Sequence, residues 1–169
     1  MFKLRELERR DLEQINRWRN DPGLIACLGA PFRFINPEVD GRWYEGYMAG
    51  RGSAVRCAVT EDDSDEILAL VSLTGIDHLN QSAELHIMVG KAENRGRGVG
   101  TFAVNAMVRH AFDNLNLHRV ELSVLASNEA ARRLYERAGF TREGVKRASR
   151  YKNGKFVDLL LYARLREEQ

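Results

Sequence analysis

The sequence is poor in the features that mark secreted, metal-binding and membrane proteins. It has two cysteines, Cys27 and Cys57, whose spacing matches no metal-ligand motif, so we expect ordinary thiols in a reducing compartment. No apolar run reaches the roughly 18 to 20 residues that a bilayer span needs, and the charged start MFKLRELERRDLE is unlike a signal peptide. These absences predict a soluble cytoplasmic protein with no membrane partner and no bound metal.

The sequence also lacks an excess of charge of one sign. It has 26 Lys and Arg residues against 24 Asp and Glu residues, a net charge of +2, which is too balanced to indicate a nucleic-acid partner. Hydrophobic residues make up 44% and charged residues 30%, which excludes wholesale disorder. The 169 residues predict a single domain, 1–169, that buries roughly two-thirds of its unfolded surface.

Strand and helix patterns alternate along the chain. The strand patterns cover residues 2–7, 54–60, 67–74, 83–89, 119–125 and 156–162, the last joined to a preceding strand by the turn Asn153-Gly154. The helix patterns cover residues 11–21, 37–50, 98–114 and 128–138. We expect Asp11 to cap the first helix and Asp21-Pro22 to end it, with residues 22–36 irregular. This order predicts a mixed α/β or α+β sheet with helices packed on it.

An acidic turn separates two of these strands. Residues 61–66 contain five acids in six positions, but they lack the length and the glycine of a calcium loop. We therefore expect a solvated hairpin tip.

The most informative segment is a glycine-rich loop between a strand and a helix, over residues 94–101. Gly96, Gly98 and Gly100 alternate, so the backbone can turn tightly and approach a ligand closely. The following helix directs its free N–H groups and the positive end of its dipole to the same place. The loop therefore predicts an anion site suited to a phosphate or pyrophosphate.

Several phosphate-binding classes share such loops. A nucleotide P-loop needs a lysine before Thr101, and a dinucleotide fingerprint needs a glycine at that position; neither is present. A single Arg-Gly repeat between a strand and a helix is a poor RNA-binding segment. An ordinary glycine-rich turn remains the alternative without a ligand.

Two spaced motifs resemble one known family. Arg95-x-x-Gly98-x-Gly100 is similar to the acyl-CoA pyrophosphate loop of the GNAT N-acetyltransferases. The second motif of that family is matched by Ser127-Asn128-x-x-Ala131-x-x-Leu134-Tyr135-Glu136-x-x-Gly139-Phe140, and the strand before the loop by Ala83-Glu84-Leu85. Residues 11–21, with Trp18-Arg19-Asn20-Asp21, resemble the branch of ribosomal-protein N-terminal, spermidine and amino-sugar acetyltransferases.

The resemblance implies a fold and a cosubstrate. The expected fold is a single α/β (α+β) domain with a mixed, mostly antiparallel sheet of six to seven strands and about four helices. Acetyl-CoA, with no metal, is expected between two splayed central strands. The implied cofactor-binding residues are Ile87, Met88, Val89, Arg95, Gly96, Arg97, Gly98, Val99, Gly100, Thr101, Asn128 and Tyr135. Asn128 is also expected to cap the helix that follows it.

The resemblance also implies catalytic roles. Tyr135 is expected to be the general acid near the CoA sulfur, because a phenol is protonated at neutral pH. Glu84 is the candidate general base, acting directly or through water. His86 shares its strand face and has a suitable imidazole, although related sequences tend to have a small residue there. His86 could tune the base, narrow the acceptor pocket or only pack.

The acceptor amine is less specified by the sequence. It is expected to lie against residues 22–36, the second helix and the C-terminal hairpin, where Glu38, Asp40 and Glu45 are the only acids among arginines and aromatics. We rank a protein or peptide α-amine first, then an amino-sugar nucleotide or other small amine, then spermidine. A non-catalytic acyl-CoA-binding protein is the alternative class. The resemblance also implies a homodimer through the C-terminal strands or a higher homo-oligomer.

Overall fold

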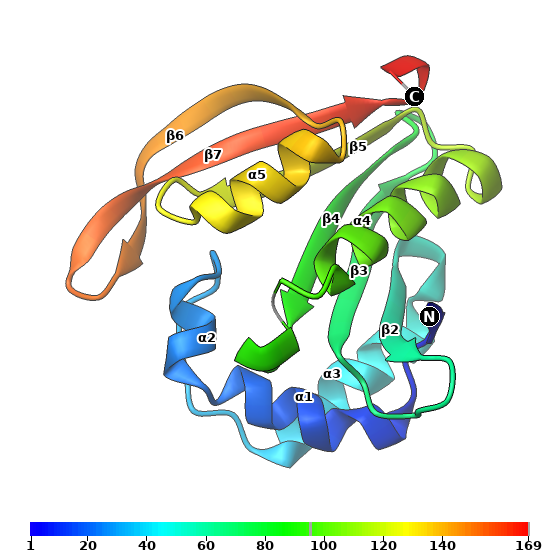
Figure 1. The fold of residues 1–169 in the computed structure, drawn as a ribbon, viewed down its shortest axis with the longest axis vertical. Helices are drawn as coiled ribbons and strands as arrows, with labels where there is room; N and C mark the ends of the chain where they lie inside the picture. The colour runs from blue at the N-terminus through cyan, green and yellow to red at the C-terminus, as the bar shows by residue number, and fades with distance from the viewer. Residues whose placement is uncertain (95, 169) are drawn as a thin grey trace.

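The computed structural model describes residues 1–94 and 96–168 and contains one mixed seven-stranded sheet (Figure 1). The strand order is β1-β2-β3-β4-β5-β7-β6, and among the strands of the described residues only β4 and β5 are parallel neighbours. The strands are β1 (Phe2–Glu6), β2 (Val55–Glu61), β3 (Ala69–Asp77), β4 (Ser82–Val89), β5 (Arg119–Leu125), β6 (Thr141–Lys152) and β7 (Lys155–Leu165).

Five α-helices accompany the sheet in the described residues. They are α1 (Leu12–Arg19), α2 (Pro22–Ala26), α3 (Pro37–Ala49), α4 (Val99–Arg109) and α5 (Glu129–Arg137), and α4 continues into a π-helical turn at His110–Asn114. Short 3₁₀ turns lie at Arg9–Asp11, Arg51–Ser53, Ala92–Asn94 and Arg166–Glu168. None of the helices in the described part of the chain is long and apolar enough to cross a membrane.

The predicted order of strands and helices is confirmed, with one additional helix. Residues 22–26, expected to be irregular, form α2. The Asp21 carboxylate accepts hydrogen bonds from the N–H groups of Gly23 and Leu24, and Pro22 occupies the first helical position. The dipeptide that ends one helix therefore starts another.

The predicted cap at Asp11 is wrong. The Asp11 side chain makes no capping bond to α1; it accepts the backbone N–H of Glu8 at 2.9 Å instead. Its carboxylate also forms a two-point ion pair with Arg5, with N–O distances of 2.7 and 2.8 Å. A carboxylate this deeply buried gains more from a charged partner than from a helix end.

The acidic turn is exposed, as expected, but its acids are not simply solvated. Glu66 pairs with Lys91 at 2.7 Å, and Asp65 pairs with Arg10 at 3.0 Å. Glu61, at the end of β2, pairs with Arg97 at 2.6 Å. The Glu61–Arg97 contact therefore connects the end of β2 to the glycine-rich loop, and the Glu66–Lys91 contact connects the turn to the segment just before that loop.

The core consists of two clusters, one on each face of the sheet. Alternation along β2 and β3 sends Val59 and Val71 to one cluster and Ala58 and Leu70 to the other. α4 and α5 cover the first face, as Figure 1 shows, while α1 and α3 supply side chains to the second. α4 contacts β1, β3 and β4, so the β1–β4 part of the sheet has helices packed against both of its faces.

A close contact fixes the end of β4 against α1. Gly90 follows β4 directly, and a Cβ atom at this position would lie 2.1 Å from Cε2 of Trp18, whose side chain is buried. Only glycine allows this approach, so α1 helps to set where the glycine-rich loop begins.

We predict that Gly90→Ala destabilises the protein by about 1–3 kcal/mol, because the buried indole has to move. Urea denaturation and thermal unfolding measure this loss. Gly52→Ala is the matched control, because no atom lies within 4 Å of its added Cβ. Equal stability of the two variants would contradict the packing argument.

Candidate active site

The parallel pair β4 and β5 separates soon after it begins. The two strands pair only over Ser82–Glu84 and Arg119–Glu121. Beyond that point β4 remains paired with β3, and β5 remains paired with β7. In the described residues, the edge of β4 from 85 to 89 therefore has no strand partner on the side that faces β5.

The alternating direction of the backbone hydrogen bonds along β4 shows which of its backbone groups face this gap. The Gly90 N–H donates to the Leu68 carbonyl of the segment leading into β3, at 3.0 Å. Because an antiparallel ladder alternates every second residue, Met88 also directs its backbone groups toward β3. Ile87 and Val89 direct theirs into the gap, where an extended ligand can bind them.

The glycine-rich loop lies at the end of this gap. Gly96 and Gly98 have φ values of +78° and +89°, which residues with a Cβ atom rarely adopt, and the space beside each is open. Gly98 begins α4 by accepting the Phe102 N–H at 2.9 Å. The first-turn N–H groups of α4 then lack helical acceptors and point outward from its N-terminus.

The loop also touches the second motif. A Cβ atom on Gly100 would lie 2.8 Å from Cδ1 of Leu134, so α4 and α5 approach closely at this point. Val99 is buried and Thr101 is exposed. Arg95, the first residue of the predicted pyrophosphate-binding loop, lies outside the described residues.

The side chain of Arg97 forms its hydrogen bonds with other residues of the chain. Its guanidinium donates to Asn94 Oδ1 at 2.9 Å and to Glu61 at 2.6 Å, and Asn94 is itself buried. The side chain thus anchors the loop to the end of β2, while the backbone N–H of Arg97 belongs to the loop. The acids at 61–66 were the sequence signal for this anchor, which sequence reasoning missed.

Tyr135 is buried within α5. Its ring packs edge-on against Phe140 with centroids 6.0 Å apart, and burial raises the pKa of Tyr135 to about 12. The phenol is therefore protonated at neutral pH.

Asn128 caps α5, as predicted. Its Oδ1 accepts the Ala131 N–H at 3.1 Å. Its Nδ2 donates to the Cys27 carbonyl just after α2, at 3.0 Å. Lys152 Nζ holds the same segment by donating to the carbonyls of Ile25 and Ala30. The segment after α2 is thus connected both to α5 and to the C-terminal hairpin.

Glu84 and His86 lie on the sheet face opposite α4 and α5, as their alternation predicts. His86 Nε2 lies 3.7 Å from Glu84 Oε2 and 2.9 Å from Thr74 Oγ1 on β3. Partial desolvation lowers the pKa of His86; Glu84 opposes this shift and the charge of Arg56 adds to it. The imidazole is therefore neutral at pH 7 and can accept a proton.

The acids expected near the acceptor are largely neutralised by neighbours. Asp40 is fully buried and bound by Arg19 and Asn16. Glu38 pairs with Arg42, and Glu45 pairs with Arg9. No group of three or more His, Cys, Asp or Glu side chains in the described residues has a metal-binding arrangement.

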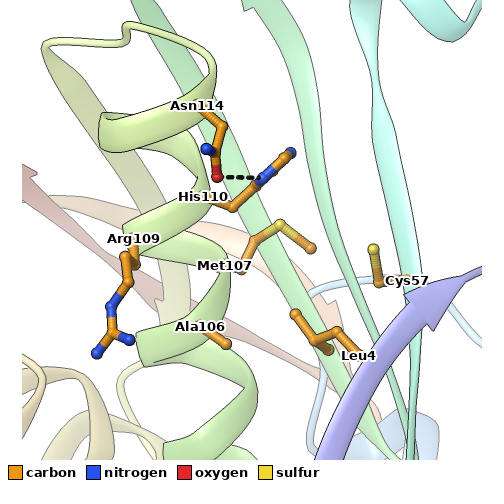
Figure 2. A pocket seen from close by; sticks show the side chains of 7 residues that line it. All are labelled: Leu4, Cys57, Ala106, Met107, Arg109, His110 and Asn114. Atoms are coloured by element: carbon orange, nitrogen blue, oxygen red, sulfur yellow. Dashed lines mark hydrogen bonds between the residues drawn. The ribbon is translucent and has the colours of Figure 1, made fainter.

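A shallow apolar hollow of about 300 Å³ lies elsewhere, between β1, β2 and the end of α4 (Figure 2). Leu4, Cys57 and Met107 face it, and His110 Nδ1 lies 3.0 Å from Asn114 Oδ1 at its rim. Burial raises the pKa of the Cys57 thiol to about 11, so this cysteine is protonated and unreactive. The hollow is separated from the β4–β5 gap by β3.

We predict that His86 titrates below its ordinary pKa of about 6.5, and that two substitutions move this pKa in opposite directions. Glu84→Gln lowers it further, because a stabilising negative charge is lost. Arg56→Gln raises it, because a repelling positive charge is lost. NMR titration of the imidazole Cε1–H signal measures all three values.

The sign of the linked stability follows from the lowered pKa. The folded chain holds the His86 proton less tightly than the unfolded chain does, so this contribution to stability is present above about pH 6.5 and is lost as the pH falls through the lowered value. A wild-type titration midpoint at or above the ordinary value would contradict the geometry described for the Glu84–His86–Thr74 group.

The comparisons with known proteins agree with the geometry. A family model described as Acetyltransferase (GNAT) domain matches residues 2–141. The chain is 31% identical over 157 residues to a spermidine N(1)-acetyltransferase of Vibrio cholerae, covering 92% of this chain and 88% of that protein. It is 27% identical over 154 residues to the ribosomal-protein-serine acetyltransferase of Escherichia coli, covering 89% and 84%.

The fold comparison extends over nearly the whole chain. The crystal structure of spermidine N-acetyltransferase from Vibrio cholerae in complex with CoA and spermine matches with a TM-score of 0.92 and 26% identity, covering 99% of this chain and 96% of that chain. The fold expected from the two motifs is confirmed. The chain belongs to the GNAT family of acetyltransferases, and it is an N-acetyltransferase with acetyl-CoA as its acetyl donor.

Proposed function

We propose that the pantetheine arm of acetyl-CoA binds in the gap between β4 and β5, and that a primary amine reaches the thioester from the Glu84–His86 face. The observation that carries this proposal is the separation of the two parallel strands directly beside the glycine-rich loop. An extended thioester fits there like an added strand, with its pyrophosphate at the start of α4.

The proposed cofactor contacts are mainly backbone contacts. Ile87 and Val89 supply N–H and carbonyl groups to the pantetheine, with Met88 between them. The loop from Arg95 to Thr101, including Gly96, Arg97, Gly98, Val99 and Gly100, supplies N–H groups to the pyrophosphate. Asn128 has one further amide hydrogen beyond its bond to Cys27, so it can donate to the pantetheine without releasing α2.

The proposed chemistry is direct attack on the thioester. The amine nitrogen bonds to the acetyl carbon, the carbon–sulfur bond breaks, and the sulfur keeps the electron pair. Glu84 or neutral His86 takes the amine proton, directly or through water. Tyr135 donates a hydrogen bond to the departing sulfur. Its raised pKa favours hydrogen-bond donation over complete proton transfer to a thiolate.

For the acceptor, we propose a protein or peptide α-amine. The acids Glu38, Asp40 and Glu45 are each paired with an arginine, which argues against a site for a polycation there. The same region exposes the aromatic pair Phe32 and Phe34, which can contact a polypeptide.

Three alternatives to this function are separated by the experiments below. Spermidine is the second candidate acceptor, because the Vibrio cholerae relative bears that activity in its name. An amino-sugar nucleotide or other small amine is the third kind of acceptor. A non-catalytic acyl-CoA binder is the remaining alternative, and it predicts cofactor binding with no thiol release.

The proposal extends to assembly and compartment. β6 is an edge strand, and its hairpin with β7 exposes Tyr151 and Phe156, whose rings contact each other at 5.2 Å. We propose that this hairpin forms a homodimer and that the enzyme works in the cytoplasm, where its two free thiols stay reduced.

We predict that acetyl-CoA at 100 times its dissociation constant stabilises the wild type by about 2.7 kcal/mol. Tyr135→Phe keeps this stabilisation and lowers the rate of thiol release by about 10²-fold or more, because only the hydrogen bond to the sulfur is lost. Gly98→Ala reduces the stabilisation, because alanine disfavours the left-handed backbone conformation that Gly98 has in the glycine-rich loop. Thermal unfolding and a thiol assay measure both quantities.

The thiol assay with a panel of amines separates the remaining functions. The panel contains peptides with free and blocked N-termini, an amino-sugar nucleotide and spermidine. Release that requires the free peptide N-terminus supports the proposed acceptor. Stabilisation without release for any amine would favour the binder, and no stabilisation at all would overturn the cofactor site.

We predict a dimer in sedimentation velocity, with a mass about twice 19.3 kDa. The double variant Tyr151→Ser, Phe156→Ser should sediment as a monomer with an unchanged response to acetyl-CoA. A monomeric wild type would contradict the proposed assembly.

A further inference from the structure

Arg56 lies in the same row of side chains as His86. Arg56 on β2 pairs with Ser72 on β3, and Ser72 pairs with His86 on β4. Two strand spacings separate Arg56 from His86, or about 10 Å between Cα atoms. Because paired residues share a face, the guanidinium of Arg56 stands on the sheet face where Glu84 and His86 meet the acceptor.

The guanidinium of Arg56 is held rigidly by neutral groups. It packs over the rings of Trp43 and Tyr47, 4.8 and 5.8 Å from their centroids, and donates to Ser72 Oγ at 3.3 Å. Its Nε is buried and has no acceptor among the described residues. Within the described chain, no carboxylate lies within ion-pair distance of this guanidinium.

The carboxylates nearest to this part of the sheet are already bound. Asp40 pairs with Arg19, and Glu6 accepts from Arg51 and from the Tyr47 hydroxyl. Glu84 faces His86. Arg56 is therefore a half-buried cation without a counter-charge, an arrangement that is costly unless an anion completes it. Burial lowers the pKa of Arg56, which agrees with an uncompensated charge.

We propose that Arg56 binds an anionic group of the acceptor, a carboxylate or phosphate, on the sheet face of Glu84 and His86 and two strands away from His86. The inference rests on the acceptor face assigned under the proposed function and narrows the acceptor to an amine that carries an anion. In a peptide, an acidic side chain next to the N-terminal residue supplies it; in an amino sugar, a phosphate does. The planar guanidinium suits both groups, and its charge repels a polyamine.

Matched acceptors test this inference in the wild-type protein without any substitution. One pair is a peptide with Asp in its second position and the same peptide with Asn there. A second pair is glucosamine 6-phosphate and glucosamine, and spermidine is the cationic member. We expect kcat/KM to favour the anionic member of one pair by about tenfold or more, with the preference decreasing as salt rises. The pair that shows it identifies the source of the anion.

Substitutions then assign the preference to Arg56. In Arg56→Gln the ratio of kcat/KM for the anionic member to that for the neutral member should fall to near one; a change in the pKa of His86 affects both members alike and cancels in this ratio. Arg56→Lys should retain part of the preference, because the charge remains and the two-point geometry is lost. Arg17→Gln is the control, because Arg17 is an exposed arginine on α1 paired with Glu13. An unchanged thermal response to acetyl-CoA establishes that each variant is folded.

Two results would overturn the inference. One is equal use of the anionic and neutral members by the wild type; the other is a preference that Arg56→Gln leaves intact. If no amine is acetylated although acetyl-CoA binds, the proposed function fails instead. In that case calorimetry of both peptides with the CoA-loaded protein decides the inference, because it predicts tighter binding of the Asp peptide.

Discussion

The early end of the β4–β5 pairing is the constraint on which the rest of the structure depends. Each strand keeps its other neighbour, so the sheet divides into a β1–β4 half and a β5–β7 half that remain joined only near Glu84 and Glu121. The exposed backbone edge of β4 would be a liability in most proteins. Here it is the binding surface of the proposed cofactor, and the strand face beside it is the surface for the acceptor.

Contacts from several elements hold the glycine-rich loop at the mouth of this gap. Trp18 on α1 fixes Gly90, at the end of β4 before the loop, and the Glu61–Arg97 pair ties the loop to β2. Leu134 on α5 lies against Gly100 at its end. Positioning of this kind can account for much of the rate of an acetyl transfer, because the reaction needs little more than a neutral amine beside a fixed thioester.

The sequence was sufficient for the features that depend on local patterns. The order of elements, the α5 cap at Asn128, the shared face of Glu84 and His86, and the fold expected from the two motifs all followed from spacing or resemblance. The gap itself was expected only through the family resemblance, because no local pattern encodes where two parallel strands separate.

Apart from α2, which begins locally at Asp21 and Pro22, the features that sequence reasoning missed depend on long-range register. The position of Thr74 beside His86 follows only from the alignment of β3 with β4. The position of Arg56 in the same row of side chains as His86 also requires the alignment of β2 with β3. Asp11 was misassigned for a related reason: a buried ion pair with Arg5 on β1 outweighs a local cap. Partners across strands are chosen by tertiary packing, which residue spacing does not record.

The most direct measurement is residue-resolved amide hydrogen exchange along β4, by NMR, with and without acetyl-CoA. The account predicts that acetyl-CoA slows exchange at Ile87 and Val89, whose N–H groups face the gap. Met88 should change little, because its N–H is already directed toward β3. Protection of Met88 with none at Ile87 and Val89, or protection confined to another part of the chain, would contradict the proposed binding of the cofactor along the open edge of β4.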